Sequence, residues 1–342
     1  MMRQIYATFA LVVIAGVNFP QARAAETPVL TPVATFNGVQ VTGITVSDEG
    51  RIFATFPRWR EGVPFSVVEI MKDGSSKPYP DQAWNTWRGE PERDRFVSVQ
   101  SVVAHGDSLY VLDPASPNMT GVVGYAKLYE FNLKNDRLIR TLLFPPQIAP
   151  EKSYLNDMRI DGHMMYVTDS GLGAIIVLDL KEKTAMRRLS AHDSTKSEDV
   201  VLNVEGQALL RDGKPLRIDS DGIELRDGFL YYHALTAYTL YRVPVAALND
   251  NTLPESKVIA QIENLGKTPA PDGMIFDDAG NLYMADLESN AIVYRTPEGK
   301  IRTLVKDPLI KWADTFAIDH ASGKLLFTTS RIHEALPGQP VT

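Results

Sequence analysis

GNLYMAD at residues 280–286 places the apolar–aromatic pair Leu282-Tyr283 two residues after a glycine, at the start of a short strand-like run. The same arrangement recurs along the chain as GRIFATF, GDSLYVLD, GHMMYVTD, GFLYYHA and GKLLFTT. The aromatic residues of these six pairs are 57, 56, 65, 52 and 44 residues apart. Self-similarity with a period of roughly 50 residues is typical of stacked or radially repeated structural units.

Each repeat reads as four short strands separated by turns. A polar residue and an apolar run precede each pair, as in PDGMIFDD, and further alternating runs follow it, as in YAKLYEFNL and LIRTLLF. Four strands per unit are typical of a propeller blade, and no long stripe of helical period is present. We therefore predict an all-β, six-bladed β-propeller, with an ordinary β-sandwich as the alternative. The ring is expected to close through residues 33–36 as the outer strand of the last blade, whose third strand, after Ser330, should be short or irregular.

The N-terminus has the features of a secretory signal peptide. Arg3 gives a positive start, residues 5–17 form an apolar run, and Ala22-Arg23-Ala24 is a small-residue cleavage pattern. We predict a signal peptide at residues 1–24 and one propeller domain at residues 25–342, in a secreted or periplasmic protein with no membrane span after cleavage. An uncleaved membrane anchor is the competing interpretation.

Composition excludes several classes of function. The chain has no cysteine, so disulfides, thiolate metal ligands and thiol nucleophiles are excluded. The net charge of −7 and scattered basic residues argue against a nucleic-acid partner. Nucleotide-binding Gly-rich loops, zinc-protease motifs and the GxSxG nucleophile motif are absent from the sequence. We expect a monomer with a small-molecule partner.

Polar residues occupy one equivalent position at the start of each innermost strand. Alignment of the repeats on their aromatic pairs brings together Thr42, Gln100, Asn156, Asp221, Asp272 and Asp314. Carboxylate and amide oxygens that converge on one axis are hard ligands, suited to Ca²⁺ or another divalent cation. The sequence thus predicts a cation site at Asn156, Asp221 and Asp272, and ligand contacts from Gln100 and Asp314. The alternative is that these residues only cap turns between blades.

Aromatic residues between the repeats form a second candidate layer. Trp59 lies in a loop after the first pair, and His233 follows Tyr231-Tyr232 near the end of a predicted strand. Both are candidates to line the mouth of the shaft, where ring faces attract flat or cationic ligands. The alternative is that such aromatics wedge the blades together and that His233 is a core histidine.

Several stretches resemble the major royal jelly and yellow protein family, in its bacterial branch. They are FATFPRWREGVPFSVVEI, KPYPDQAWN, FVSVQSVVAHGDSLYVLD, KLYEFNLKNDRLIRTLLFP, YVTDSGLGAIIVLDL and SDGIELRDGFLYYHAL, and PDGMIFDDAGNLYMADLESNAIVYR continues the likeness. The resemblance implies a secreted six-bladed propeller. It also implies functions that range from dopachrome rearrangement to binding of biogenic amines, and no catalytic motif can be transferred from it.

A more distant resemblance is to the gluconolactonase and senescence marker protein propellers. That family holds a cation in its shaft, and the segments LNDMRID, SDGIEL and APDGMIFDD resemble its ligand-bearing segments at Asn156, Asp221 and Asp272. Asp221 stands where that family has Asn. Thr42-Gly43 stands where it has Glu-Gly, so one charged ligand is missing.

Two classes of function follow. In the first, the shaft binds a small organic ligand, aromatic or amine-bearing, with or without a tautomerase or isomerase activity. In the alternative, a Ca²⁺-like cation makes the protein a lactonase or related hydrolase. In either enzyme, Asp221 and Asp272 are the candidates for proton transfer.

Overall fold

The apolar–aromatic pairs lie on the second strands of six four-stranded antiparallel sheets. Successive side chains on a strand point to opposite faces, so each pair reaches both neighbouring sheets. Leu109 packs with Phe53 between the first two blades, whereas Tyr110 packs with Met165 between the second and third. The pairs therefore connect consecutive interblade cores.

The sixth pair is shifted by one residue. Phe327 and Leu325 face the core shared with the fifth blade, which contains Tyr283, whereas Leu326 faces the core shared with the first blade. In the other blades it is the apolar member that faces the preceding blade. Leu325-Leu326 is therefore the structural equivalent of Leu282-Tyr283.

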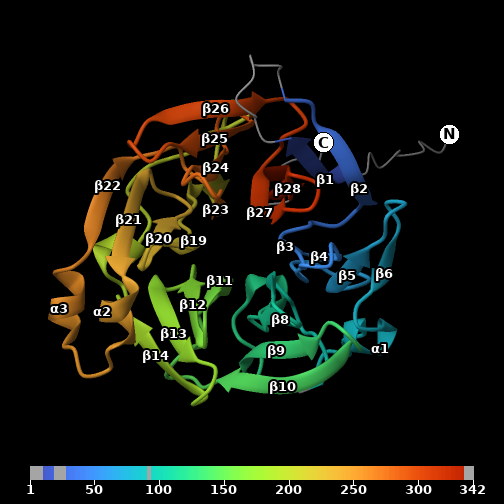
Figure 1. The fold of residues 1–342 in the computed structure, drawn as a ribbon, viewed down its shortest axis with the longest axis horizontal. Coiled ribbons are helices and arrows are strands. Elements are labelled where there is room, and N and C mark those ends of the chain that lie inside the picture. Colours follow the sequence, from blue (N-terminus) through green and yellow to red (C-terminus); the bar gives the residue numbers. More distant parts are fainter. Residues whose placement is uncertain (1–10, 19–27, 91–93, 335–342) are drawn as a thin grey trace.

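The six sheets are arranged radially around one axis (Figure 1). This is a computed structural model, and the residues it describes are 11–18, 28–90 and 94–334. The first three blades, from the axis outward, are β3 (Ile44–Val46), β4 (Ile52–Thr55), β5 (Val67–Ile70) and β6 (Ser76–Pro78); β7 (Ser101–His105), β8 (Ser108–Asp113), β9 (Ala126–Asn132) and β10 (Arg137–Phe144); and β11 (Leu155–Asp161), β12 (Met164–Asp169), β13 (Ala174–Asp179) and β14 (Thr184–Arg188).

The remaining three blades complete the circle. They are β19 (Ser220–Arg226), β20 (Phe229–Ala234), β21 (Thr239–Pro244) and β22 (Glu263–Lys267); β23 (Met274–Phe276), β24 (Leu282–Asp286), β25 (Ala291–Arg295) and β26 (Ile301–Lys306); and β27 (Ala313–Asp319), β28 (Lys324–Thr329), β1 (Leu11–Asn18) and β2 (Thr31–Asn37). The innermost strands contact one another in sequence, and β27 contacts β3. These contacts close the ring and confirm the predicted six-bladed propeller.

The last blade is completed by the N-terminal part of the chain. β2 is its outer strand, in agreement with the prediction for residues 33–36. The third strand is β1, which pairs with β28 on one side and with β2 on the other. It does not come from the chain after Ser330, where the described residues form the short 3₁₀ helix η3 (Ile332–Glu334). The predicted cleavage site at residues 22–24 lies outside the described residues, so cleavage stays a prediction.

Few elements lie outside the blades. Two small hairpins, β15 (Asn203–Val204) with β16 (Gln207–Ala208) and β17 (Leu210–Arg211) with β18 (Lys214–Pro215), lie between the third and fourth blades in the sequence. We call residues 196–218 the cap segment. The helices are α1 (Gln82–Asn85), α2 (Val245–Asn249), α3 (Glu255–Ile259), η1 (Pro117–Met119), η2 (Asp193–Thr195) and η3.

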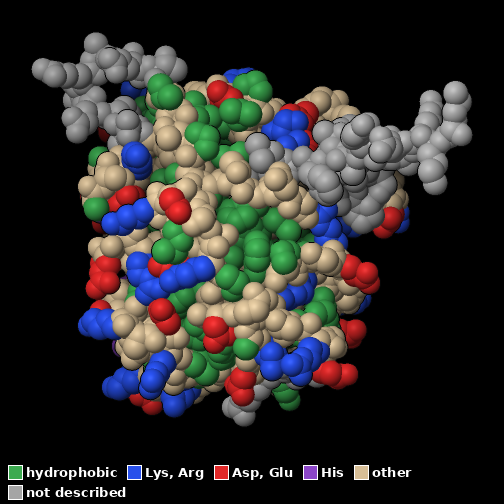
Figure 2. Space-filling model, turned by 90° about the vertical axis from the view of Figure 1, so that its right-hand side faces the viewer, with side chains coloured by type: hydrophobic (Ala, Val, Ile, Leu, Met, Phe, Trp, Pro, Cys, Tyr) green, Lys and Arg blue, Asp and Glu red, His purple; other side chains and the backbone are tan. Residues whose placement is uncertain are grey.

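The outer surface carries charges of both signs. Figure 2 shows Lys and Arg side chains interspersed with Asp and Glu over the face drawn. On that face no broad patch of one sign appears, as expected from the scattered charges of the sequence. No helix in the described part of the chain is long and apolar enough to cross a membrane.

Candidate functional site

The aligned ring residues meet at one end of the central shaft. Five of the six line a single cavity of about 270 Å³, and they are Gln100, Asn156, Asp221, Asp272 and Asp314. Thr42 does not line it, because its hydroxyl group donates to the Gln100 carbonyl oxygen at 2.9 Å and lies 3.1 Å from the Thr55 hydroxyl. The repeat alignment therefore located the pocket, except at the first blade.

Glycines that follow the ring residues allow the blades to approach closely. A Cβ atom at Gly273 would lie 2.3 Å from the Asp314 carbonyl oxygen, and one at Gly222 would lie 2.6 Å from that of Asp272. The Gly273 amide donates to the Asp314 carbonyl oxygen at 2.7 Å. The Asp-Gly dipeptides thus bring the starts of neighbouring inner strands into backbone contact, which draws their side chains together.

Three aspartates form the inner end of the pocket. Asp221, Asp272 and Asp314 are 3–5% exposed. Asp221 Oδ2 accepts from Asn156 Nδ2 at 2.7 Å, and Asp272 Oδ2 accepts from the indole N–H of Trp312 at 2.6 Å. Asp314 Oδ1 accepts from the Thr315 hydroxyl at 3.1 Å, whereas its Oδ2 is buried without a hydrogen bond among the described residues. Within that part of the chain, no lysine or arginine forms an ion pair with any of the three.

Burial makes these carboxyl groups hold protons more tightly than usual. It raises the pKa of Asp272 to about 7, even though the Trp312 N–H favours the charged form. Burial, followed by the charges of Asp272 and Asp314, raises the pKa of Asp221 well above its ordinary range. Burial and the charge of Asp272 do the same for Asp314. Desolvation and like charges both disfavour ionisation, so the triad retains protons at neutral pH unless a cation neutralises it.

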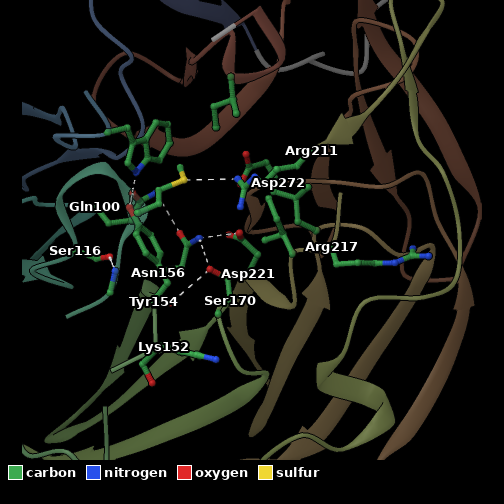
Figure 3. A pocket seen from close by; sticks show the side chains of 18 of the residues that line it. Gln100, Ser116, Lys152, Tyr154, Asn156, Ser170, Arg211, Arg217, Asp221 and Asp272 are labelled. Atoms are coloured by element: carbon green, nitrogen blue, oxygen red, sulfur yellow. Dashed lines mark hydrogen bonds between the residues drawn. The ribbon is translucent and has the colours of Figure 1, made fainter. Parts of the chain in front are cut away.

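A chain of hydrogen bonds runs from the aromatic wall to the carboxylates. Trp59 Nε1 donates to the Tyr154 hydroxyl at 2.6 Å, which donates to Gln100 Oε1 at 2.8 Å. Gln100 Nε2 lies 3.3 Å from Asn156 Oδ1, and Asn156 Nδ2 reaches Asp221. Each member fixes the orientation of the next. The wall therefore presents two aromatic rings and an ordered set of dipoles to the cavity (Figure 3).

The outer end of the pocket is basic. Lys152, Arg211 and Arg217 line the cavity together with Met119 and Ile218. Arg211, Arg217 and Ile218 belong to the cap segment, which extends over this end of the shaft. All acidic residues that line the cavity are in the inner triad. The pocket is thus polarised, with buried acids at the axis and bases at the mouth.

At the opposite end of the shaft, a buried ion-pair network lines a second cavity of about 420 Å³. Arg159 donates from Nη1 to Asp157 Oδ2 at 2.8 Å and from Nε to Glu224 Oε2 at 3.0 Å. It also donates to the Met274 carbonyl oxygen at 3.1 Å, and Asp157 accepts from the Ser101 hydroxyl at 2.7 Å. Asp157 and Glu224 thus share a buried basic partner, which the acids of the triad lack among the described residues.

The comparison with protein families supports the resemblance seen in the sequence. The model of the family described as "Major royal jelly protein" matches residues 97–336. The chain belongs to the major royal jelly protein family. It is 24% identical over 249 residues to major royal jelly protein 7 of Apis mellifera, covering 66% of this chain and 54% of that protein. It is 24% identical over 304 residues to protein yellow of Drosophila yakuba, covering 80% of this chain and 54% of yellow. The chain spans about half the length of these curated relatives.

Solved structures share the fold at low sequence identity. A chain of the nidogen–laminin complex superposes with a TM-score of 0.55 at 9% identity, covering 90% of this chain and 98% of that one. A Bacteroides caccae protein of unknown function gives 0.54 at 11% identity, covering 89% and 98%. An auxiliary nutrient binding protein from Bacteroides thetaiotaomicron gives 0.54 at 9% identity, covering 95% and 75%. At this identity the likeness concerns the fold alone.

The motifs that carried the royal jelly resemblance have a structural role beside the pocket. Buried Arg58, from PRW, donates to the carbonyl oxygens of Asn85, Phe96 and Val97. Asn85, from AWN, accepts from the backbone amide of Ser66 at 2.7 Å. These bonds fix the loop from which the adjacent Trp59 reaches the cavity. The motif thereby positions a pocket residue of this royal jelly family member.

His233 does not lie in the pocket, although the sequence suggested it as a ligand contact. It is fully buried in the fourth blade, where Nδ1 contacts the Ala234 carbonyl oxygen at 2.6 Å and Nε2 contacts the Thr268 hydroxyl at 3.0 Å. Burial lowers its pKa to about 4. Both ring nitrogens are occupied by the protein, so the core-histidine alternative describes this residue.

Sequence reasoning missed several residues of the pocket. Tyr154 lies two positions before Asn156 on the chain entering β11 and joins the hydrogen-bond chain. Trp312, an aromatic between two repeats like Trp59, does not line the cavity; it is fully buried and its indole N–H donates to Asp272. Tyr154 belongs to a segment that leads into a ring residue, which was the available signal. Arg211 carried no such signal, because the cap segment lies outside the repeat.

Proposed function

We propose that this royal jelly family propeller binds a small amine-bearing organic molecule in the shaft pocket. The observation that carries the proposal is the triad Asp221, Asp272 and Asp314. Three buried acids without a basic partner in the described structure are costly to ionise together, and a cationic ligand would remove that cost. An ammonium group also supplies three hydrogen-bond donors for the acceptor oxygens that line the inner end.

The wall and the volume favour a compact ligand with an aromatic part. Trp59 and Tyr154 line the cavity and are held by their mutual hydrogen bond. Ring faces attract cations and pack against other rings. A cavity of about 270 Å³ lies just below the usual range for small-molecule sites, roughly 300–1,000 Å³, so a single-ring amine suits it.

Calorimetric titration with 2-phenylethylamine tests the proposal. We expect binding to the native protein at pH 7.5 and at least about a tenfold loss in Asp272→Asn, because this change removes the charge while keeping the side-chain size. Asp278→Asn is the matched control, since Asp278 is exposed and lines cavities away from the shaft pocket. Equal affinity in Asp272→Asn and the native protein would contradict the proposal.

An isomerase activity is the second candidate, supported by the pKa of about 7 at Asp272. A carboxyl group with this pKa can accept and donate a proton at neutral pH. Asp272 would take a proton from a carbon beside a carbonyl group and return it at another position of the same molecule, so no oxidant or reductant is needed. Phenylpyruvate in D₂O is a direct probe. Faster deuterium exchange at its methylene group with native protein than with Asp272→Asn supports this activity, and equal exchange contradicts it.

A divalent cation is the alternative occupant of the inner end. Asn156, Asp221 and Asp272 supply amide and carboxylate oxygens, the donor chemistry that Ca²⁺ prefers. A cation bound there would act as a Lewis acid in the lactonase alternative. A different cluster of the described residues has the spacing of a metal site: the ligand atoms of Glu205, His333 and Glu334 lie within 4.8 Å of one another. Lys311 forms ion pairs with both of these glutamates. A rise in melting temperature with Ca²⁺, absent in Asp272→Ala, would support the shaft cation; an unchanged curve would exclude it.

A further inference from the structure

The mouth of the pocket carries a basic residue whose charge the described protein does not compensate. Arg211 lines the cavity, and its Nη2 lies 3.6 Å from Met119 Sδ across the mouth. It forms no ion pair with any described residue. A thioether is a weak acceptor, so the guanidinium group keeps most of its donors available.

We infer that Arg211 binds an anionic group of the ligand, and hence that the ligand is a small zwitterion whose ammonium end lies at the triad and whose carboxylate lies at the mouth. The inference rests on the proposed amine-binding function and specifies its ligand. A planar guanidinium fork matches a carboxylate with two parallel hydrogen bonds, which gives direction as well as attraction.

The cap segment holds Arg211 in place without using its side chain. Leu209 and Leu216, on either side of the β17–β18 hairpin, are 3% exposed and pack in the core that contains Trp312. Their amides donate to the carbonyl oxygens of Leu202 and Leu209 at 2.8 and 3.0 Å. Arg211 pairs with Lys214 across a two-residue turn. The hairpin backbone is therefore anchored, and Arg211 projects from it over the pocket.

Arg217, in the same cap segment, differs from Arg211 because its guanidinium group is bound by neighbouring residues of the protein. It donates to the carbonyl oxygens of Glu198 and Val200 and forms an ion pair with Asp199. Figure 3 shows its guanidinium group directed away from Asp221 and Asp272, whereas the Arg211 side chain points into the pocket, with Nη2 toward Met119 Sδ. Lys152, at the rim, forms no ion pair in the described structure and adds positive potential to the mouth. The polarity of the pocket thus fixes one orientation for a dipolar ligand.

Three matched probes separate this inference from amine binding itself. 4-(2-Aminoethyl)benzoate carries a carboxylate at the far side of its ring from the ammonium group, 2-phenylethylamine lacks that carboxylate, and 4-(2-aminoethyl)benzamide replaces it with a neutral group of similar size. In calorimetry at pH 7.5 we expect the native protein to bind the benzoate about tenfold more tightly than either amine, because a charge-assisted hydrogen bond at a partly shielded site contributes about that much. In Arg211→Gln this preference should disappear, while the affinity for 2-phenylethylamine should not fall, because loss of a positive charge from the pocket does not weaken the binding of a cation.

Two further variants make the result specific. Arg211→Lys keeps the charge but loses the fork, and should retain part of the preference. Arg137→Gln removes an exposed arginine from outer strand β10 and should retain all of it. If all three probes bind the native protein equally, or if Arg211→Gln keeps the preference, the inference is overturned and amine binding stands. If none of the probes binds, both proposals fail.

Discussion

Asp272 combines the features that make the pocket chemically unusual. It is buried, it accepts a hydrogen bond from Trp312, and it interacts with two further carboxyl groups. The sequence predicted that Asp272 faces the axis, because the repeat alignment placed it in register with Asp221. Its raised pKa could not be predicted, because the shift depends on how deeply the fold buries the group and on residues from other blades.

The raised pKa values give the unliganded protein a distinctive pH dependence. Aspartate has a pKa of about 3.9 in an unfolded chain, whereas the triad retains protons to higher pH and Asp272 has a pKa of about 7. From about pH 4 to 7 the native state therefore binds more protons than the unfolded state, so this contribution to stability decreases as pH rises.

Thermal melts at pH 5 and pH 8 measure that dependence. We expect Asp272→Asn to raise the melting temperature at pH 8 relative to the native protein, by a few degrees, and to change it little at pH 5, because the neutral amide removes the repulsion only where it exists. Asp278→Asn serves as an exposed control. Identical shifts of Asp272→Asn at both pH values would show that the triad is not under electrostatic strain.

At the level of the strands, the spacing between the repeats predicted more of the fold than the sequence of any single strand did. The recurrence of the pairs predicted six sheets, and the polar residues upstream predicted which positions meet at the axis. The sixth pair was misread by one residue, since GKLLFTT offers two leucines before its aromatic and only packing distinguishes them. The cap segment was not predicted, because its four strands are two residues each and leave no periodic signal.

The Asp-Gly dipeptides at the starts of the inner strands bring the triad together. Gly273→Ala would place a methyl group 2.3 Å from the Asp314 carbonyl oxygen, which is backbone and cannot rotate away. We expect a loss of about 1–3 kcal/mol in the free energy of unfolding, the usual cost of overpacking. Affinity for 2-phenylethylamine should also fall, because the displaced strand carries Asp314.

Urea denaturation and calorimetry of Gly273→Ala are the relevant measurements. Gly299→Ala is a useful comparison, since its nearest neighbour is the flexible end of the Arg295 side chain and it lies in a turn of the fifth blade away from the shaft. That substitution should lower stability through its positive φ of 84° without changing ligand affinity. Unchanged stability in Gly273→Ala would mean that the blades are not in backbone contact there.

For the whole molecule, the decisive feature is how the ring closes. A radial fold must pair the sheet edges at its chain ends, and here the N-terminal strands β1 and β2 complete the blade begun by β27 and β28. The family match begins at residue 97 and so does not include β1 or β2. β1 also lies within the predicted signal peptide, so the sequence admits two roles for this segment: a leader that is removed, or a strand that closes the ring.

The export prediction and the position of β1 can be tested together. The apolar run at residues 5–17 predicts cleavage near Ala25, whereas β1 lies between β28 and β2 with Ile14 and Val17 buried. We expect intact-mass measurement of protein from its native host to give a start at Ala25 or Glu26. Removal of β1 would leave the edge of β28 free, and β2, which pairs with β1 in this structure, is the adjacent strand that would have to move inward to pair with it. Ala34→Pro in the cleaved protein should then lower the melting temperature, because proline removes a backbone donor at a position of β2 that pairs regularly with its neighbouring strand. A mature chain that retains residues 11–18 would contradict the export prediction and would make β1 a permanent strand of the sixth blade.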